Sequence, residues 1–117
     1  MHNFKNLKVW QKAIDLAVDV YEALSVLPID ERYGLTAQMK RCSISISSNI
    51  AEGAGRSTGA QFKYFLTISQ GSAFELETQL MISARLKLIE EEVVSKLLAQ
   101  TTQIQKMIYS LEKLIKN

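Results

Sequence analysis

The chain has 117 residues and a mass of 13.2 kDa, the size of a single domain with a modest core. Apolar residues make up 47% and charged residues 22%, and one proline with five glycines is too few for a disordered or all-β protein. The single Cys42 excludes an internal disulfide framework, and a net charge of +2 is too mild to indicate nucleic-acid binding by itself.

Residues 7–27 are predicted to form the first helix, with Asn6 as its N-cap and Pro28 as its stop. Apolar residues recur there at alternating spacings of three and four, which is one stripe of a helix. We expect this stripe to face the core. Its members are Leu7, Trp10, Ile14, Ala17, Tyr21 and Leu24.

Residues 32–54 are predicted to form the second helix. Its segment SISIS, residues 43–47, alternates like a strand, but a wider stripe of Leu35, Met39, Ile46 and Ile50 keeps helical spacing and favours a helix. Its last turns carry an expected structural motif. There Asn49 fixes the register of neighbouring helices, Glu52 pairs with Arg41 or Arg56, and Gly53 begins a glycine-rich break.

Residues 59–88 and 90–116 are predicted to form the third and fourth helices. Thr58 and Gln61 match a capping box, while Gly71 and Ser72 are expected to allow a neighbouring helix to approach closely. Glutamates open the fourth helix and lysines close it, as the helix dipole favours. The inner stripe of the fourth helix is Val94, Leu97, Thr101, Ile104, Ile108, Leu111 and Ile115.

Helices of this length joined by short connections are typical of antiparallel neighbours. We therefore predict a single all-α domain over residues 1–117, an antiparallel up-down-up-down four-helix bundle. No signal peptide and no apolar run long enough to span a bilayer are visible, so we expect a cytoplasmic protein without a membrane partner.

The sequence offers no catalytic constellation, and we expect a protein that is not an enzyme and has no cofactor. The only histidine is His2, so the Glu-x-x-His pairs of a di-metal bundle are absent and Cys42 has no other histidine partner. Ser110 and Lys113 match Ser-x-x-Lys without its companion motifs. The run GAGRSTG, residues 53–59, follows a helix and lacks phosphate-loop spacing, which favours a helix–helix turn.

Basic residues are unevenly distributed along the chain, whereas the segment from Glu75 to Glu92 is net acidic. Three interpretations stay open: solvated faces, acid–base pairing across subunits, or a basic rim that meets RNA or DNA phosphates. The candidates for nucleic-acid binding are Lys8, Lys12, Lys40, Arg41, Arg56 and Lys63.

Four segments of the chain resemble the small bacterial four-helix-bundle proteins named after the 23S rRNA intervening sequence. They are Phe4–Tyr21, Glu31–Arg41, Ser45–Arg56 and Phe65–Leu80, in the family's order, and the run NIAEG is the most specific. The fourth helix matches only in pattern. Cys42 and Ser43 stand where the family more often has alanine, and since both are small we expect packing to survive.

The resemblance implies a homopentamer with its bundles in a ring, and no enzyme activity is attached to the family. A related branch, the accessory variability proteins of diversity-generating retroelements, is a basic pentameric barrel that binds a reverse transcriptase and nucleic acid. Our leading hypothesis is an oligomeric scaffold that binds RNA or another nucleic acid. The alternative is a protein-interaction scaffold that binds a partner protein such as a reverse transcriptase.

Overall fold

The computed structural model describes residues 3–27 and 34–117, and within them the chain forms four long helices and no strand. The predicted stop at Pro28 and the predicted first residues of the second helix, 32 and 33, lie outside these ranges. A short 3-10 turn, η1 (Phe4–Asn6), precedes the bundle. The long helices are α1 (Lys8–Leu24), α2 (Leu35–Ala54), α3 (Gly59–Arg85) and α4 (Glu91–Leu114).

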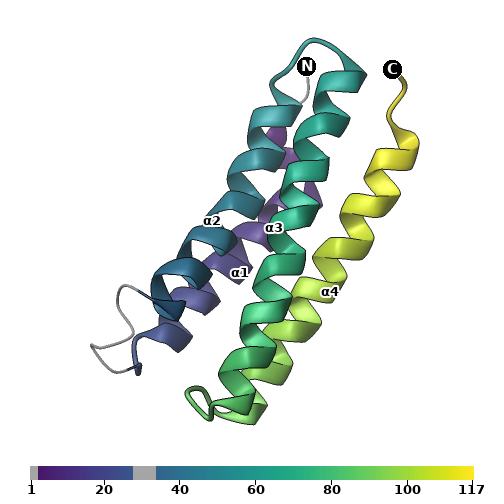
Figure 1. Cartoon of the computed structure of the whole chain (residues 1–117). Coiled ribbons are helices and arrows are strands. Elements are labelled where there is room, and N and C mark those ends of the chain that lie inside the picture. The colour runs from purple at the N-terminus through teal and green to yellow at the C-terminus, as the bar shows by residue number, and fades with distance from the viewer. Residues whose placement is uncertain (1–2, 28–33) are drawn as a thin grey trace.

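Each helix packs beside the next one in the sequence, and α4 closes the arrangement against α1. In the described ranges the diagonal pairs bring no Cα atoms within 8 Å of each other, and successive helices run in opposite directions (Figure 1). The up-down-up-down bundle is therefore confirmed. Its topology brings the start of α1, the α2–α3 turn and the end of α4 to one end of a body measuring 44 × 23 × 20 Å.

The buried face of α1 differs from the predicted stripe. The core is formed by residues one position away from most of that stripe, and only Leu24 belongs to both: Val9, Ala13, Leu16, Val20 and Leu24. The predicted Ile14 and Tyr21 are 37% and 40% exposed. The prediction was wrong for most of the stripe because α1 carries two apolar stripes with the same helical spacing. The core takes the aliphatic one, and of the predicted stripe Leu7 and Trp10 pack against it half-buried.

Helix α2 is helical through SISIS, as predicted, although its buried face is rich in serine. The hydroxyls of Ser43 and Ser47 donate to the carbonyls of Lys40 and Ile44 within the same helix, at 2.9 and 3.1 Å. These bonds satisfy the buried hydroxyls locally, so no polar partner is needed in the core.

Contacts between α2 and α3 are the most extensive in the bundle, since small residues line this seam. The Ser69 hydroxyl donates to the Ile46 carbonyl at 2.8 Å, and the hydroxyls of Ser45 and Ser72 share a hydrogen bond of 2.8 Å. A Cβ added at Gly53 would lie 2.8 Å from the Phe65 Cβ and 3.1 Å from a backbone carbonyl oxygen of α3. This seam therefore depends on the missing side chain of Gly53.

The predicted role of Gly71 in close approach is wrong, because a Cβ there would meet nothing within 4 Å. Ser72, by contrast, does contact α2 through its bond to Ser45. Gly71 lies on the exposed side of α3, where a glycine only weakens the helix.

The helix ends agree with the sequence in part. Thr58 caps α3 by accepting from the Gln61 N–H at 3.2 Å, which is one of the two hydrogen bonds of the predicted capping box. Asn6 is not the cap of α1, because the chain first forms η1, which Asn3 caps, and Leu7 then takes the N-cap position. Helix α1 ends at Leu24, three residues before the predicted end.

Helix α3 ends at Arg85, whereas the prediction extended it to residue 88. Lys87 takes a left-handed conformation, with φ at 57°, and the N–H groups of Lys87 and Leu88 donate to the carbonyls of Ala84 and Ser83. This is a Schellman motif, usually formed with glycine in the left-handed position. Because lysine replaces that glycine, no residue type in this segment indicates that the helix stops.

We expect Gly53→Ala to lower the free energy of unfolding by about 1–3 kcal/mol, since the extra methyl meets a backbone atom and the α2–α3 seam must open. The matched change Gly71→Ala should raise it by about 0.5–1 kcal/mol, because alanine favours the helix and nothing obstructs it. Urea unfolding monitored by circular dichroism measures both. Equal effects of the two changes would contradict the account of the seam.

Candidate nucleic-acid interface

The antiparallel topology gathers basic side chains at one end of the bundle. We define the basic end as residues 3–15, 45–71 and 103–117, the half that holds the α2–α3 turn and the end of α4 (Figure 1). Three carboxylates lie in this half, Asp15, Glu52 and Glu112, against eight lysines or arginines. These eight are Lys5, Lys8, Lys12, Arg56, Lys63, Lys106, Lys113 and Lys116.

The other described half, residues 16–27, 34–44 and 72–102, is the opposite end, where the balance of charge reverses. It holds five basic residues, Lys40, Arg41, Arg85, Lys87 and Lys96, against seven carboxylates. The carboxylates are Asp19, Glu22, Glu75, Glu77, Glu90, Glu91 and Glu92. The charge that is segregated along the sequence is thus also segregated along the bundle axis.

The predicted nucleic-acid residues do not form one cluster. Lys8, Lys12, Arg56 and Lys63 lie at the basic end, whereas Lys40 and Arg41 lie at the opposite end. Arg41 lies 13 residues before Ala54, the last residue of α2, which is about 20 Å along the helix axis, and Arg56 follows in the turn. The Lys40 ammonium instead lies over the Tyr21 ring, 5.0 Å from its centroid, and Arg41 donates to the Gln38 side chain at 2.9 Å.

Four basic residues of this end were not among the predicted candidates: Lys5, Lys106, Lys113 and Lys116. The predicted topology could have identified them, since an up-down-up-down order places the end of the fourth helix beside the start of the first. Basic residues of these two segments are far apart in the sequence but lie at the same end of the bundle.

Two of the basic side chains at this end have defined partners. Arg56 forms an ion pair with Glu52 four residues earlier, and its guanidinium lies 4.8 Å from the centre of the Phe65 ring. The Lys113 ammonium lies 4.3 Å from the centre of the Tyr109 ring. In the described part of the chain, no ion pair or hydrogen bond engages the side chains of Lys8 and Lys12. These two lysines are therefore available to an external anion.

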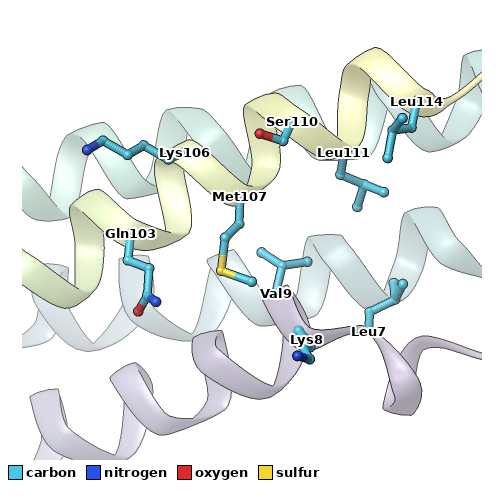
Figure 2. A pocket seen from close by; sticks show the side chains of 9 residues that line it. All are labelled: Leu7, Lys8, Val9, Gln103, Lys106, Met107, Ser110, Leu111 and Leu114. Atoms are coloured by element: carbon cyan, nitrogen blue, oxygen red, sulfur yellow. The ribbon is translucent and has the colours of Figure 1, made fainter.

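A hollow of about 410 Å³ lies between α1 and α4 at this end, and we call it the basic-end hollow. Figure 2 shows Met107 and Gln103 reaching from α4 toward α1, with Val9 directed back at them. The lining is mainly apolar, and no carboxylate belongs to it. The lining residues are Leu7, Lys8, Val9, Gln103, Lys106, Met107, Ser110, Leu111 and Leu114.

The three residues of the expected structural motif, Asn49, Glu52 and Gly53, make different contacts. Asn49 donates to the carbonyl and hydroxyl oxygens of Ser45, at 2.8 and 3.0 Å, so its direct bonds stay within α2. The Ser45 hydroxyl makes the connection to Ser72 on α3. Glu52 pairs with Arg56, not with Arg41. Gly53 is the residue of this group that itself lies in the α2–α3 seam.

Residues suited to catalysis are dispersed in the structure. No group of three or more metal-binding side chains occurs in residues 3–27 and 34–117. Lys113 lies over Tyr109 and makes no hydrogen bond to Ser110. The Cys42 thiol lies against the Glu75 carboxylate, at 3.8 Å, and has no basic side chain as a hydrogen-bond partner.

Comparison with known sequences identifies the family. The family model of the 23S rRNA-intervening sequence protein matches residues 5–110. The chain belongs to this family.

A solved structure supports the same assignment. It is a crystal structure of a protein of unknown function from the S23 ribosomal protein family of Bacteroides thetaiotaomicron. It is similar to this chain with a TM-score of 0.83 and 26% sequence identity, over 90% of this chain and 95% of that chain. No curated protein matches the sequence. Among the described helices of this 23S rRNA-intervening sequence protein, none is both long and apolar enough to cross a membrane.

We expect the Cys42 thiol of this family member to react slowly with iodoacetamide. Burial raises the pKa of the thiol, and the neighbouring Glu75 carboxylate raises it further, against a lowering contribution from Gln79. A raised pKa leaves less thiolate at any given pH, and the thiolate is the nucleophile. The rate should therefore reach half its maximum at a higher pH than in the urea-unfolded chain, as followed by mass spectrometry.

The matched variant for this prediction is Glu75→Gln, which removes the negative charge and keeps the size of the side chain. It should move the rate profile of Cys42 to lower pH. A profile that is unchanged by Glu75→Gln would contradict the contribution of the carboxylate.

Proposed function

We propose that this family member is a non-enzymatic, oligomeric scaffold that binds RNA through the basic end of its bundle. The observation that carries the proposal is the charge balance at that end, where eight basic residues are set against three carboxylates. One of the three, Glu52, is already paired with Arg56. Lysines and arginines gathered on one end of a domain are the electrostatic signature of phosphate-backbone binding.

The basic-end hollow favours RNA with unpaired nucleotides over a regular duplex. Its apolar floor is flanked by Lys8 and Lys106, whose charges suit the phosphates on either side of one nucleotide. Gln103 and Ser110 supply a donor and acceptors at the rim, suited to the edge of a base. Proteins recognise RNA sequence mainly in loops and bulges, where bases are free to leave the stack.

The proposal is tested with a fluorescent RNA hairpin that carries an unpaired loop, titrated with the protein over a series of salt concentrations. We expect the logarithm of the association constant to fall linearly with the logarithm of the salt concentration, because bound phosphates release counterions. The same hairpin as DNA and a blunt RNA duplex should bind more weakly. Absent binding, or binding independent of salt, would refute the proposal.

A matched pair of variants locates the site. Lys8→Gln with Lys12→Gln should reduce the steepness of the salt dependence by about one for each lysine, since both side chains are exposed and unpaired. Arg85→Gln with Lys87→Gln removes the same charge at the opposite end and should leave RNA affinity within about twofold of wild type. Equal losses in both variants would assign the binding to net charge alone.

The proposed assembly is supported by the second apolar stripe of α1. Trp10 is half-buried, and Ile14, Val18 and Tyr21 expose 37%, 51% and 40% of their surface. An uninterrupted apolar face of this kind is typical of a surface that associates with another protein. The resemblance to pentameric relatives suggests that the partner is the same chain.

We therefore expect light scattering at micromolar concentration to give a mass several times the 13.2 kDa of one chain. The mass should stay constant between low and moderate salt, because apolar burial holds the subunits together. A mass of 13.2 kDa under these conditions would refute the proposed assembly. RNA binding is tested separately by the hairpin titration.

A further inference from the structure

One exposed apolar feature crosses from α1 to α2, and we call it the apolar ridge: Ile14, Val18, Tyr21 and Ile44. Lys40 lies over Tyr21, and α1 and α2 are antiparallel. Ile44, one turn after Lys40, is therefore level with Val18, about one turn before Tyr21. The exposed fractions of Val18 and Ile44 are 51% and 45%. Lys40 and Arg41 place positive charge at one end of the ridge.

A second hollow lies on the other side of α1, between α1 and α4 at the opposite end of the bundle. It has a volume of about 850 Å³, and we call it the acidic hollow. Its apolar lining includes Ala23, Val26, Val93 and Leu97, and its charged lining is formed by Asp19, Glu22, Glu90 and Lys96. Gln100 donates to the Asp19 carboxylate at 2.9 Å across the two helices.

The hollow follows from how the four helices share their contacts. The α1–α4 pair has the least extensive contact of the four neighbouring pairs, so this seam stays open where the α2–α3 seam is closed. Apolar groups such as Val26, which is 74% exposed, are left in contact with water beside it. A partner that fills the hollow gains apolar burial without displacing any part of the described chain.

We propose that the apolar ridge of one copy docks into the acidic hollow of the next copy. The inference rests on the assembly in the proposed function and names the two surfaces that form it. Charge favours this pairing, because Lys40 and Arg41 beside the ridge meet Asp19, Glu22 and Glu90 around the hollow. Apolar burial favours it as well, since the exposed ridge enters a recess of about 850 Å³ that is partly lined by apolar residues.

The two surfaces differ, so the contact is heterologous and each subunit uses one surface for each neighbour. Both surfaces flank α1, the ridge on the side of α2 and the hollow on the side of α4. A heterologous contact builds a closed ring where the rotation between neighbours closes, and an open filament where it does not. The basic-end hollow lies in the same α1–α4 seam, nearer the start of α1, and shares no lining residue with the acidic hollow.

The test uses two variants that each block one surface. Val18→Asp with Ile44→Asp blocks the ridge, and Val26→Asp with Val93→Asp blocks the hollow. Each variant alone should run as a monomer in light scattering. An equimolar mixture should form a one-to-one pair and nothing larger, because only one intact ridge meets one intact hollow. Circular dichroism confirms that each variant is folded.

The matched control is Tyr64→Asp with Ile82→Asp, which places two charges on exposed apolar positions of α3. It should assemble as the wild type does. If the ridge and hollow variants assemble like wild type, or if their mixture stays monomeric, the pairing of these surfaces is wrong. An oligomeric wild type with unaffected variants would overturn this inference alone, whereas a monomeric wild type would also overturn the proposed assembly.

A charge exchange tests the same contact without burying new charges. Lys40→Glu and Glu22→Lys should each weaken assembly at low salt, and the two together in one chain should restore it to within about threefold of wild type. Glu22 is exposed, and Lys40 is half-buried over the exposed Tyr21 ring, so folding should survive both changes. A combined variant weaker than either single one would contradict the charge pairing.

Discussion

The close approach of α2 and α3 is the constraint on which the rest of this bundle depends. Gly53 and a series of serines bring the two helices together, and the hydroxyl bonds between Ser45 and Ser72 and from Ser69 to Ile46 fix their register. Because this pair is so closely joined, the bundle is not symmetric. The looser pair is α1–α4, and both the basic-end hollow and the acidic hollow lie along it.

Long helical periodicity in the sequence was enough to predict four helices, their order and the all-α fold. It was enough on α2 as well, where the spacing of Met39, Ile46 and Ile50 correctly outweighed the local alternation of SISIS. On α1 the periodicity did not identify the buried face, since two apolar stripes with identical spacing give the same pattern. Only the packing of the other helices decides which of them is buried. The stop at Lys87 could not be predicted, because its left-handed conformation is set by backbone hydrogen bonds and not by residue type.

Only part of the candidate interface could be predicted from the sequence, because the rest depends on how the helices are arranged. Charge runs in the sequence identified Lys8, Lys12, Arg56 and Lys63 as members of a basic region, and the structure places all four at one end. The same runs also included Lys40 and Arg41, because neighbours in sequence on a long helix can lie at opposite ends of a bundle. Residues such as Lys106 are joined to the site only through topology. The sequence positions of the basic residues therefore define a surface only when the up-down order of the helices is known.

The separation of charge along the bundle axis also affects how the protein approaches a charged partner. Excess positive charge at one end and excess negative charge at the other make the molecule a permanent electric dipole. Near a polyanion such a body experiences a torque that turns its positive end forward before any contact forms. The protein then does not reach its binding orientation by random rotation alone. Its frequency of productive collisions is therefore higher than that of a protein with the same net charge distributed evenly.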